Sequence, residues 1–251
     1  MFQVCLTRMK RDNDNFITYL KKFDPIKTFE QEDIQQVLNF AYNMSFGENG
    51  EHRHYRSGGQ HKRGNGEVFA NAFQGKLSEF AVYDALKMKC DIKAPDLSTY
   101  GLGKWDDDDF QIGGKKISVK STKSFGNLLL LETKDWNEYG QYIPNIDKGT
   151  FEYDFFILVR IDPNIENLLK KNRMLYSKVI DKREICEILI KEKWQYDIPG
   201  FISKNELLYA IKNNFIIKQN QYLNRKTKID ADNYYIQTVD MHDLSNLIEL
   251  L

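Results

Sequence analysis

The segment 106–123 constrains the fold more than any other part of the chain, because two short runs of alternating apolar and polar residues flank a Gly-Gly pair. The runs cover residues 109–112 and 117–120, and Gly113 and Gly114 supply a two-residue turn between them. This arrangement predicts a β-hairpin in which the two runs pair as neighbouring antiparallel strands.

Strand parity divides the side chains of this hairpin between two faces, because successive residues of a strand point in opposite directions. The apolar face comprises Phe110, Ile112, Ile117 and Val119, and the polar face comprises Asp109, Gln111, Ser118 and Lys120. With a two-residue turn, Asp109 is expected directly across from Ser118, at about 5 Å between β-carbons, and diagonal to Lys120. A carboxylate and an ammonium held together on a rigid hairpin are the groups needed to hold a divalent metal and activate a water.

Length and composition are those of an ordinary globular chain. The 251 residues are 41% hydrophobic and 29% charged, and no internal repeat or low-complexity linker divides them. We therefore expect one domain over residues 1–251. Lys+Arg and Asp+Glu are each 36, so attraction to a polyanion must come from local clusters of charge.

The lack of targeting signals and the cysteine usage predict a cytoplasmic protein. The N-terminal residues lack the apolar core of a signal peptide, and the longest apolar runs, 128–131 and 155–159, are far too short to span a membrane. The cysteines, Cys5, Cys90 and Cys186, are odd in number and form no CxxC pair. This spacing argues against a disulfide framework or a zinc site.

The hydrophobic pattern predicts an α/β protein with strands in the middle of the chain. Helices are expected over 28–45, 68–88, 182–192, 204–213 and 242–250, and strands beyond the hairpin over 128–132, 152–161 and 233–238. The nearly continuous apolar run within 152–161 is typical of a strand at the centre of a sheet. Segment 128–132 is expected to continue from the hairpin as a third strand.

The predicted helix 68–88 has two apolar stripes, so we expect it to be sandwiched inside the protein. Glu79 lies within the second stripe among Ala72, Val82 and Leu86. A partly buried carboxylate there requires a partner. Asp84 falls in the first stripe, where the sequence offers no account of it.

Three motifs in this order resemble the PD-(D/E)xK nuclease superfamily and, within it, the type II restriction endonucleases. Gly-Lys-Leu-Ser-Glu79 matches the helix of that family, Asp109-Phe110 the strand with the Asp, and Ser118-Val119-Lys120 the following (acid)-x-Lys strand. The resemblance covers about residues 65–160. It implies a restriction-endonuclease-like core with a mixed central β-sheet flanked by helices. The activity that it implies is Mg²⁺-dependent hydrolysis of double-stranded DNA at a short specific site, leaving 5′-phosphates.

The resemblance also implies roles for individual residues. Asp109, Lys120, Glu79 and Ser118 would be catalytic, and the metal ligands would be Asp109, Glu79 and the backbone carbonyl of Val119. Two departures stand out, because no Pro precedes Asp109 and the neutral Ser118 occupies the usual acidic slot. The missing carboxylate would come from Glu79 or from Glu132, and we expect Glu79, because the direction of Glu132 depends on strand register.

Two similar acidic positions are alternatives within this motif. Pro95-Asp96 is a literal "PD", but it lies in a turn-rich stretch without strand alternation, so we expect a loop. Asp107 has the same strand parity as Asp109. It would take the role of Asp109 if the register shifted by two residues.

Two basic stretches are candidate DNA contacts. Residues 52–63 contain four Arg or Lys and no acid, and 212–228 combine basic, amide and aromatic side chains. The candidates are Arg53, Tyr55, Arg56, His61, Lys62, Arg63, Lys218, Asn220, Arg225 and Lys226. A charged, solvated surface accounts for the second stretch almost as well.

The expected partners are double-stranded DNA and a second copy of the chain, because palindromic sites require two-fold symmetry. No membrane and no organic cofactor is expected. Two other functions stay open, namely a PD-(D/E)xK nuclease without strict sequence specificity and a non-catalytic DNA-binding protein on a decayed nuclease fold.

Overall fold

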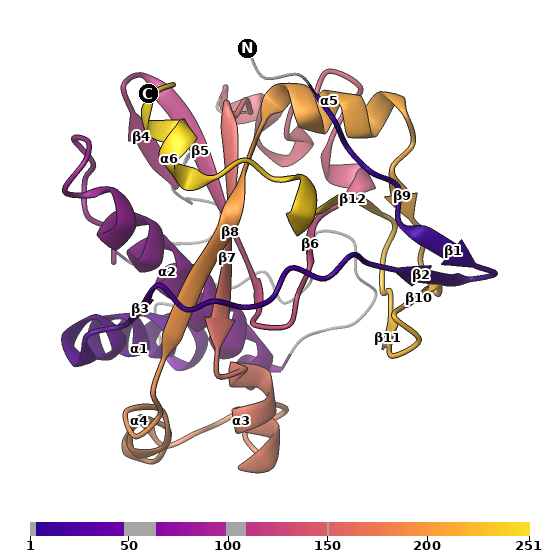
Figure 1. The fold of residues 1–251 in the computed structure, drawn as a ribbon. Coiled ribbons are helices and arrows are strands. Elements are labelled where there is room, and N and C mark those ends of the chain that lie inside the picture. Colours follow the sequence, from indigo (N-terminus) through magenta and orange to yellow (C-terminus); the bar gives the residue numbers. More distant parts are fainter. Residues whose placement is uncertain (1–3, 48–63, 99–108, 150) are drawn as a thin grey trace.

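The computed structural model describes residues 4–47, 64–98, 109–149 and 151–251. It is a mixed α/β protein in which mixed β-sheets pack against helices, as the sequence predicts (Figure 1). Within the described ranges, no helix is long and apolar enough to cross a membrane.

The central sheet has five strands in the order β3-β8-β7-β5-β4. They are β3 (Lys27–Thr28), β8 (Gln195–Ser203), β7 (Phe155–Asp162), β5 (Lys115–Lys123) and β4 (Phe110–Ile112). β5 and β7 run parallel, while the other neighbours are antiparallel. The apolar strand β7 lies between β5 and β8, so its predicted central position is confirmed.

Helices α1 (Gln31–Phe46) and α2 (Asn65–Leu86) pack together on one face of this sheet. Ile117 and Val119 of β5 share a hydrophobic core with both helices. Both stripes of α2 are buried, as Phe73 on one side and Val82 on the other show, which confirms the prediction of a sandwiched helix.

Asp84 of α2 has three partners that explain its place in an apolar stripe. Its carboxylate accepts from Lys27 Nζ at 2.9 Å and from the Tyr196 hydroxyl at 3.0 Å, and it pairs with Lys87 Nζ at 2.7 Å. Burial opposes ionisation of Asp84, but the three hydrogen bonds outweigh it and leave the pKa of the carboxyl below its usual value.

A second layer covers the opposite face of the central sheet. It contains a three-stranded sheet in the order β6-β12-β9, formed by β6 (Leu128–Glu132), β12 (Asn233–Gln237) and β9 (Ile216–Ile217). Leu129 and Leu131 of β6 share a second hydrophobic core with Phe156 and Leu158 of β7. Segment 128–132 is therefore a strand, but the expectation that it extends the hairpin's sheet is wrong, because β6 pairs with β12.

The remaining helices are short and follow the strands of the middle of the chain. They are α3 (Ile165–Lys171), α4 (Lys182–Leu189), α5 (Lys204–Lys212), α6 (Leu244–Ile248) and the 3₁₀ turns η1 (Thr133–Asp135), η2 (Ile143–Lys148) and η3 (Thr238–Asp240). α4, α5 and α6 lie within the three helical ranges predicted for the C-terminal third.

Two hairpins from opposite ends of the chain form a small four-stranded sheet that projects from one side of the molecule (Figure 1). The strands are β1 (Lys10–Asp12), β2 (Asn15–Ile17), β10 (Tyr222–Leu223) and β11 (Thr227–Lys228). β2 and β10 are neighbours and run parallel. We call this sheet the two-hairpin arm.

A buried ion pair fastens the chain between the arm and β3 to the central sheet. The Arg160 guanidinium bonds the Asp197 carboxylate at 2.8 Å and donates to the carbonyl oxygens of Lys21 and Lys22 at 2.6 and 2.8 Å. Arg160 is 1% exposed and Asp197 4%. Burial without these bonds would be costly, so the pair and the segment that it holds depend on one another.

Candidate active site

The hairpin β4–β5 has the predicted register. Phe110 pairs with Ile117 and Ile112 with Lys115. Gly113 and Gly114 have φ values of 57° and 79°, the two positive angles of a type I′ turn. The apolar face of the hairpin packs in the core with α2, which leaves the polar face toward the second layer.

Asp109 lies directly before β4, and its side chain reaches across to β5. Its Oδ2 accepts the backbone N–H of Val119 at 2.6 Å and the Ser118 hydroxyl at 3.2 Å. Ser118 is 1% exposed. The structure thus brings together Asp109 and Ser118, which the sequence expects across from one another.

The backbone of Val119 has an orientation that suits a metal ligand. In a strand, the N–H and C=O of one residue point toward the same neighbouring strand. The N–H of Val119 bonds Asp109, so the carbonyl of Val119 also points to the β4 side of β5. Val119 lies past the last residue of β5 that pairs with β4, which is Ile117. A carboxylate and a carbonyl therefore occupy the same edge of the sheet.

Lys120 lies on the same face as Ser118. The two residues pair with Leu158 and Phe156 of β7, both of which belong to the core between the central sheet and the second layer. Lys120 is half-buried, and its amine makes no ion pair or hydrogen bond to any residue in the described ranges. A half-buried ammonium without a protein partner there is suited to an anionic ligand.

Glu79 belongs to the other side of the sheet. Its helix α2 packs on the Ile117 and Val119 face, where Gln74 Nε2 donates to the Ser121 hydroxyl at 3.1 Å. Glu79 forms an ion pair with Lys76 at 2.7 Å, and the two side chains are 14% and 10% exposed. The expectation that Glu79 needs a partner is met within its own helix.

Glu132, the alternative carboxylate, lies at the end of β6 in the layer that covers the Ser118 face. The ring of Trp136, four residues further on, is 5.3 Å from that of Phe156, the neighbour of Ser118 on β7. The Glu132 side chain is 13% exposed and pairs with Lys134 at 2.8 Å. Glu132 thus lies in the layer over the Ser118 face and Glu79 on the opposite side of the sheet, and which of them supplies a second carboxylate stays a prediction.

The donor set at this edge fits a hard cation. The carboxylate of Asp109 and the carbonyl of Val119 are oxygen donors of the kind that Mg²⁺ prefers. The described residues contain no cluster of three or more His, Cys, Asp or Glu side chains that could hold a metal. The site thus provides few carboxylates and would leave several metal positions to water and substrate.

The other candidate residues lie elsewhere or outside the described ranges. Asp107 and the basic stretch with Arg53, Tyr55, Arg56, His61, Lys62 and Arg63 fall outside them. Asp96 accepts the N–H of Ser98 at 2.8 Å in a loop, as expected.

The second basic stretch belongs to the two-hairpin arm and its base. Lys218, Asn220, Arg225 and Lys226 are exposed. Arg225 reaches across to the N-terminal hairpin and pairs with Asp12 at 2.8 Å. Sequence reasoning missed the N-terminal half of this arm, although the run Asp12-Asn13-Asp14-Asn15 carries a composition typical of turns.

The chain matches no protein-family model, no curated protein and no solved structure. Its function must therefore be argued from the chemistry and placement of its own residues.

Proposed function

We propose that this protein is a Mg²⁺-dependent type II restriction endonuclease that hydrolyses double-stranded DNA at a short specific site and leaves 5′-phosphates. The observation that carries the proposal is the position of Asp109, whose carboxylate is held on Ser118 and on the backbone of Val119. The amine of Lys120, unpaired within the described ranges, shares the same strand face.

Asp109 and the Val119 carbonyl would hold the metal, with Glu132 as the second carboxylate. Bound Mg²⁺ would supply charge neutralisation at the scissile phosphate and a bound water of lowered pKa. Asp109 is suited to this role because two donors from β5 fix its side chain before any ligand arrives. A ligand that is already oriented loses little conformational freedom on binding.

Lys120 would orient the attacking water and stabilise the charge that develops on the phosphate. Its place on a central-sheet strand fixes the backbone of Lys120 next to Val119, whose N–H bonds the Asp109 carboxylate. The Ser118 hydroxyl donates to Asp109 and carries no charge, so we assign it the positioning of that carboxylate.

The test is incubation of the purified chain with long DNA in the presence of Mg²⁺, followed by mapping of the cut ends. Discrete fragments with 5′-phosphates that disappear on chelation with EDTA are expected. A smear of fragments would indicate a nuclease without site specificity. A gel shift without cleavage would indicate a DNA-binding protein without catalytic activity.

The proposal includes a homodimer, because two copies of one site related by two-fold symmetry cut both strands of a palindrome. Sedimentation equilibrium with and without a cleavage-site duplex measures the stoichiometry. Two chains per duplex are expected, and one chain per duplex would contradict the dimer.

A further inference from the structure

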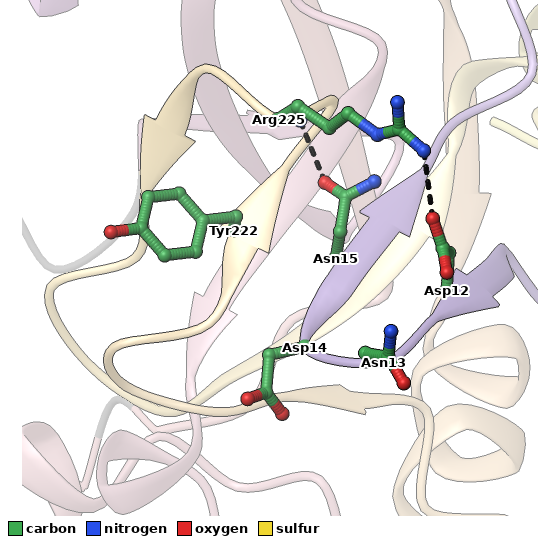
Figure 2. Close-up of a pocket in the computed structure, with 6 residues that line it drawn as sticks. All are labelled: Asp12, Asn13, Asp14, Asn15, Tyr222 and Arg225. Carbon is green, nitrogen blue, oxygen red and sulfur yellow. Dashed lines mark hydrogen bonds and ion pairs between the residues drawn. The ribbon is translucent and has the colours of Figure 1, made fainter.

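The two-hairpin arm contains an open hollow of about 360 Å³ between its N-terminal and C-terminal hairpins. Figure 2 shows the residues that line it, which are Asp12, Asn13, Asp14, Asn15, Tyr222 and Arg225. Two backbone bonds join the hairpins here, from Tyr222 N to Asp14 O and from Asn224 N to Phe16 O, each 2.8 Å.

Asn15 holds an unused hydrogen-bond donor beside this hollow. Only 9% of the residue is exposed, and its Nδ2 is buried without a hydrogen-bond partner. Its Oδ1 accepts the backbone N–H of Arg225 at 2.6 Å, which fixes the orientation of the amide because only the oxygen can accept. A buried donor left unpaired is costly, so a ligand that offers an acceptor here gains affinity.

Arg225 lies next to this donor. Figure 2 shows its side chain extended past the Asn15 amide to Asp12, where the guanidinium pairs at 2.8 Å. The Arg225 side chain is 75% exposed and that of Asp12 49%. An exposed pair of this kind is weak, so the guanidinium can leave Asp12 and turn toward a ligand in the hollow.

The charges around the hollow indicate what kind of acceptor binds. Asp12 and Asp14 line it, and two carboxylates disfavour a phosphate. In the DNA major groove, guanine presents two adjacent acceptors, N7 and O6, and its partner cytosine presents an amino donor. Asn15 and Arg225 provide two donors for the two guanine acceptors.

The hairpin β1–β2, which forms one edge of the four-stranded arm, is suited to the same groove, because a two-stranded β-ribbon fits into the major groove of B-DNA. Strand β1 is exposed along its length, and the hairpin β1–β2 projects from the body of the protein (Figure 1). The hollow therefore lies on a projecting part of the surface that a duplex can contact.

We propose that the two-hairpin arm reads a guanine in the major groove, with the Asn15 amide donating to N7 and the Arg225 guanidinium to O6. This inference rests on the proposed function, since it assigns part of the site recognition that a restriction endonuclease requires. It names a base-contacting residue, Asn15, that the basic stretches of the sequence do not contain.

The experiment uses the full chain with Asp109→Asn, which prevents cleavage during binding. Duplexes are selected from a random pool with this protein, and each guanine of the selected sequence is then replaced by 7-deazaguanine, which lacks the N7 acceptor. We expect one guanine whose replacement weakens binding by about tenfold. Asn15→Asp should weaken binding to the unmodified duplex by a similar factor. The affinity of this variant should not change further when that guanine is replaced by 7-deazaguanine.

Asn15→Asp keeps the acceptor for Arg225 N, so thermal melting should show a folded arm. The double variant Asp14→Asn with Asn15→Asp keeps the net charge and still lacks the donor, and it should show the same loss as Asn15→Asp. Recovery of wild-type affinity in this double variant would trace the loss to charge and overturn the inference.

Three further outcomes also overturn it. An equal loss on every sequence would identify a phosphate contact, and unchanged DNA affinity of Asn15→Asp would assign the hollow to another kind of partner. Additive effects of Asn15→Asp and the 7-deaza replacement would place the amide away from N7. If the Asp109→Asn protein binds no duplex from the pool, the proposed function itself fails, which is a different result.

Discussion

The carboxylate of Asp109 accepts the backbone N–H of Val119 at 2.6 Å, so a side chain that directly precedes β4 completes the hydrogen bonding of β5. One oxygen serves both the sheet and the candidate site. Changes at this position therefore separate a structural effect from a chemical one, provided that the replacement is chosen to keep or remove the acceptor.

Asp109→Asn keeps an acceptor for the Val119 N–H but removes the charge that a metal requires. Cleavage should fall by at least about a hundredfold with little change in the melting temperature. Asp109→Ala should also be inactive and should lose about 1–2 kcal/mol of stability, because the N–H loses its partner. Cleavage rates and thermal melts of both variants check this. Wild-type cleavage by Asp109→Asn would remove the residue from the site.

Lys120→Met should abolish cleavage while leaving Mg²⁺-independent DNA binding largely intact, because its ammonium is assigned to the attacking water. Lys123→Met is the matched control, since Lys123 lies three residues further along β5 on the opposite face and pairs with Glu166 at 2.7 Å. Single-turnover cleavage should be close to wild type in the control. Equal loss in the two variants would show that positive charge on β5 acts through general attraction to DNA.

Glu132→Gln should weaken the response to Mg²⁺ and cut the cleavage rate by about a hundredfold or more, because Glu132 lies in the layer over the Ser118 face. Glu79→Gln should leave the midpoint of the Mg²⁺ titration unchanged. The opposite ranking of the two variants would return the second carboxylate to Glu79, as the sequence motif expects.

Glu79→Gln should instead lower stability, because it leaves the ammonium of Lys76 mostly buried without its charged partner. The loss expected on breaking a pair of this kind is about 3 kcal/mol. The double variant Lys76→Met with Glu79→Leu should recover much of it, because no unpaired charge stays behind. Denaturant unfolding of the three proteins measures the difference, and an additive double variant would show that the two residues are not coupled.

Asp197→Ala should be the most destabilising of these changes. It leaves the fully buried Arg160 guanidinium without its carboxylate and removes the acceptor for the N–H of Asp24. A loss of about 3–5 kcal/mol is expected. It should lower the melting temperature by about 10 °C for a chain of this length. An unchanged melting temperature would mean that the segment around Asp24 is not held by this pair.

The sequence predicts the elements that local patterning determines. The hairpin turn, the central strand β7 and the two faces of α2 follow from alternation, apolar runs and helical periodicity. These signals are contained in short windows of sequence, so they need no knowledge of long-range contacts.

Strand β8 shows why other elements could not be predicted in this way. It contains Pro199 and Gly200, which usually interrupt strands, and Gly200 has a φ of 150° with the His242 carbonyl 2.5 Å from where a Cβ would lie. The pairing of β7 with β8 is irregular between Leu158 and Arg160. Tertiary packing around this irregularity overrides the local signal.

The candidate site likewise has residues that the sequence predicts and one choice that it does not. Asp109, Ser118 and Lys120 share one hairpin, so strand parity places them together. The choice between Glu79 and Glu132 depends on which helix and which strand cover each face of the sheet, and that follows from the crossing of the chain after β5. No window of sequence contains that information.

The joining of the first and last parts of the chain in the two-hairpin arm has a consequence for the order of folding. β2 pairs with β10, and the Thr7 and Tyr19 amides bond the side chains of Asp240 and Gln237. Residues 7–19 supply only half of these contacts, and their partners lie more than 200 residues further along the chain. Contacts so distant in sequence are slow to close. Pulse-labelled amides of residues 7–19 should accordingly gain protection after those of β5 and β7, so the arm is completed on a body that has already formed.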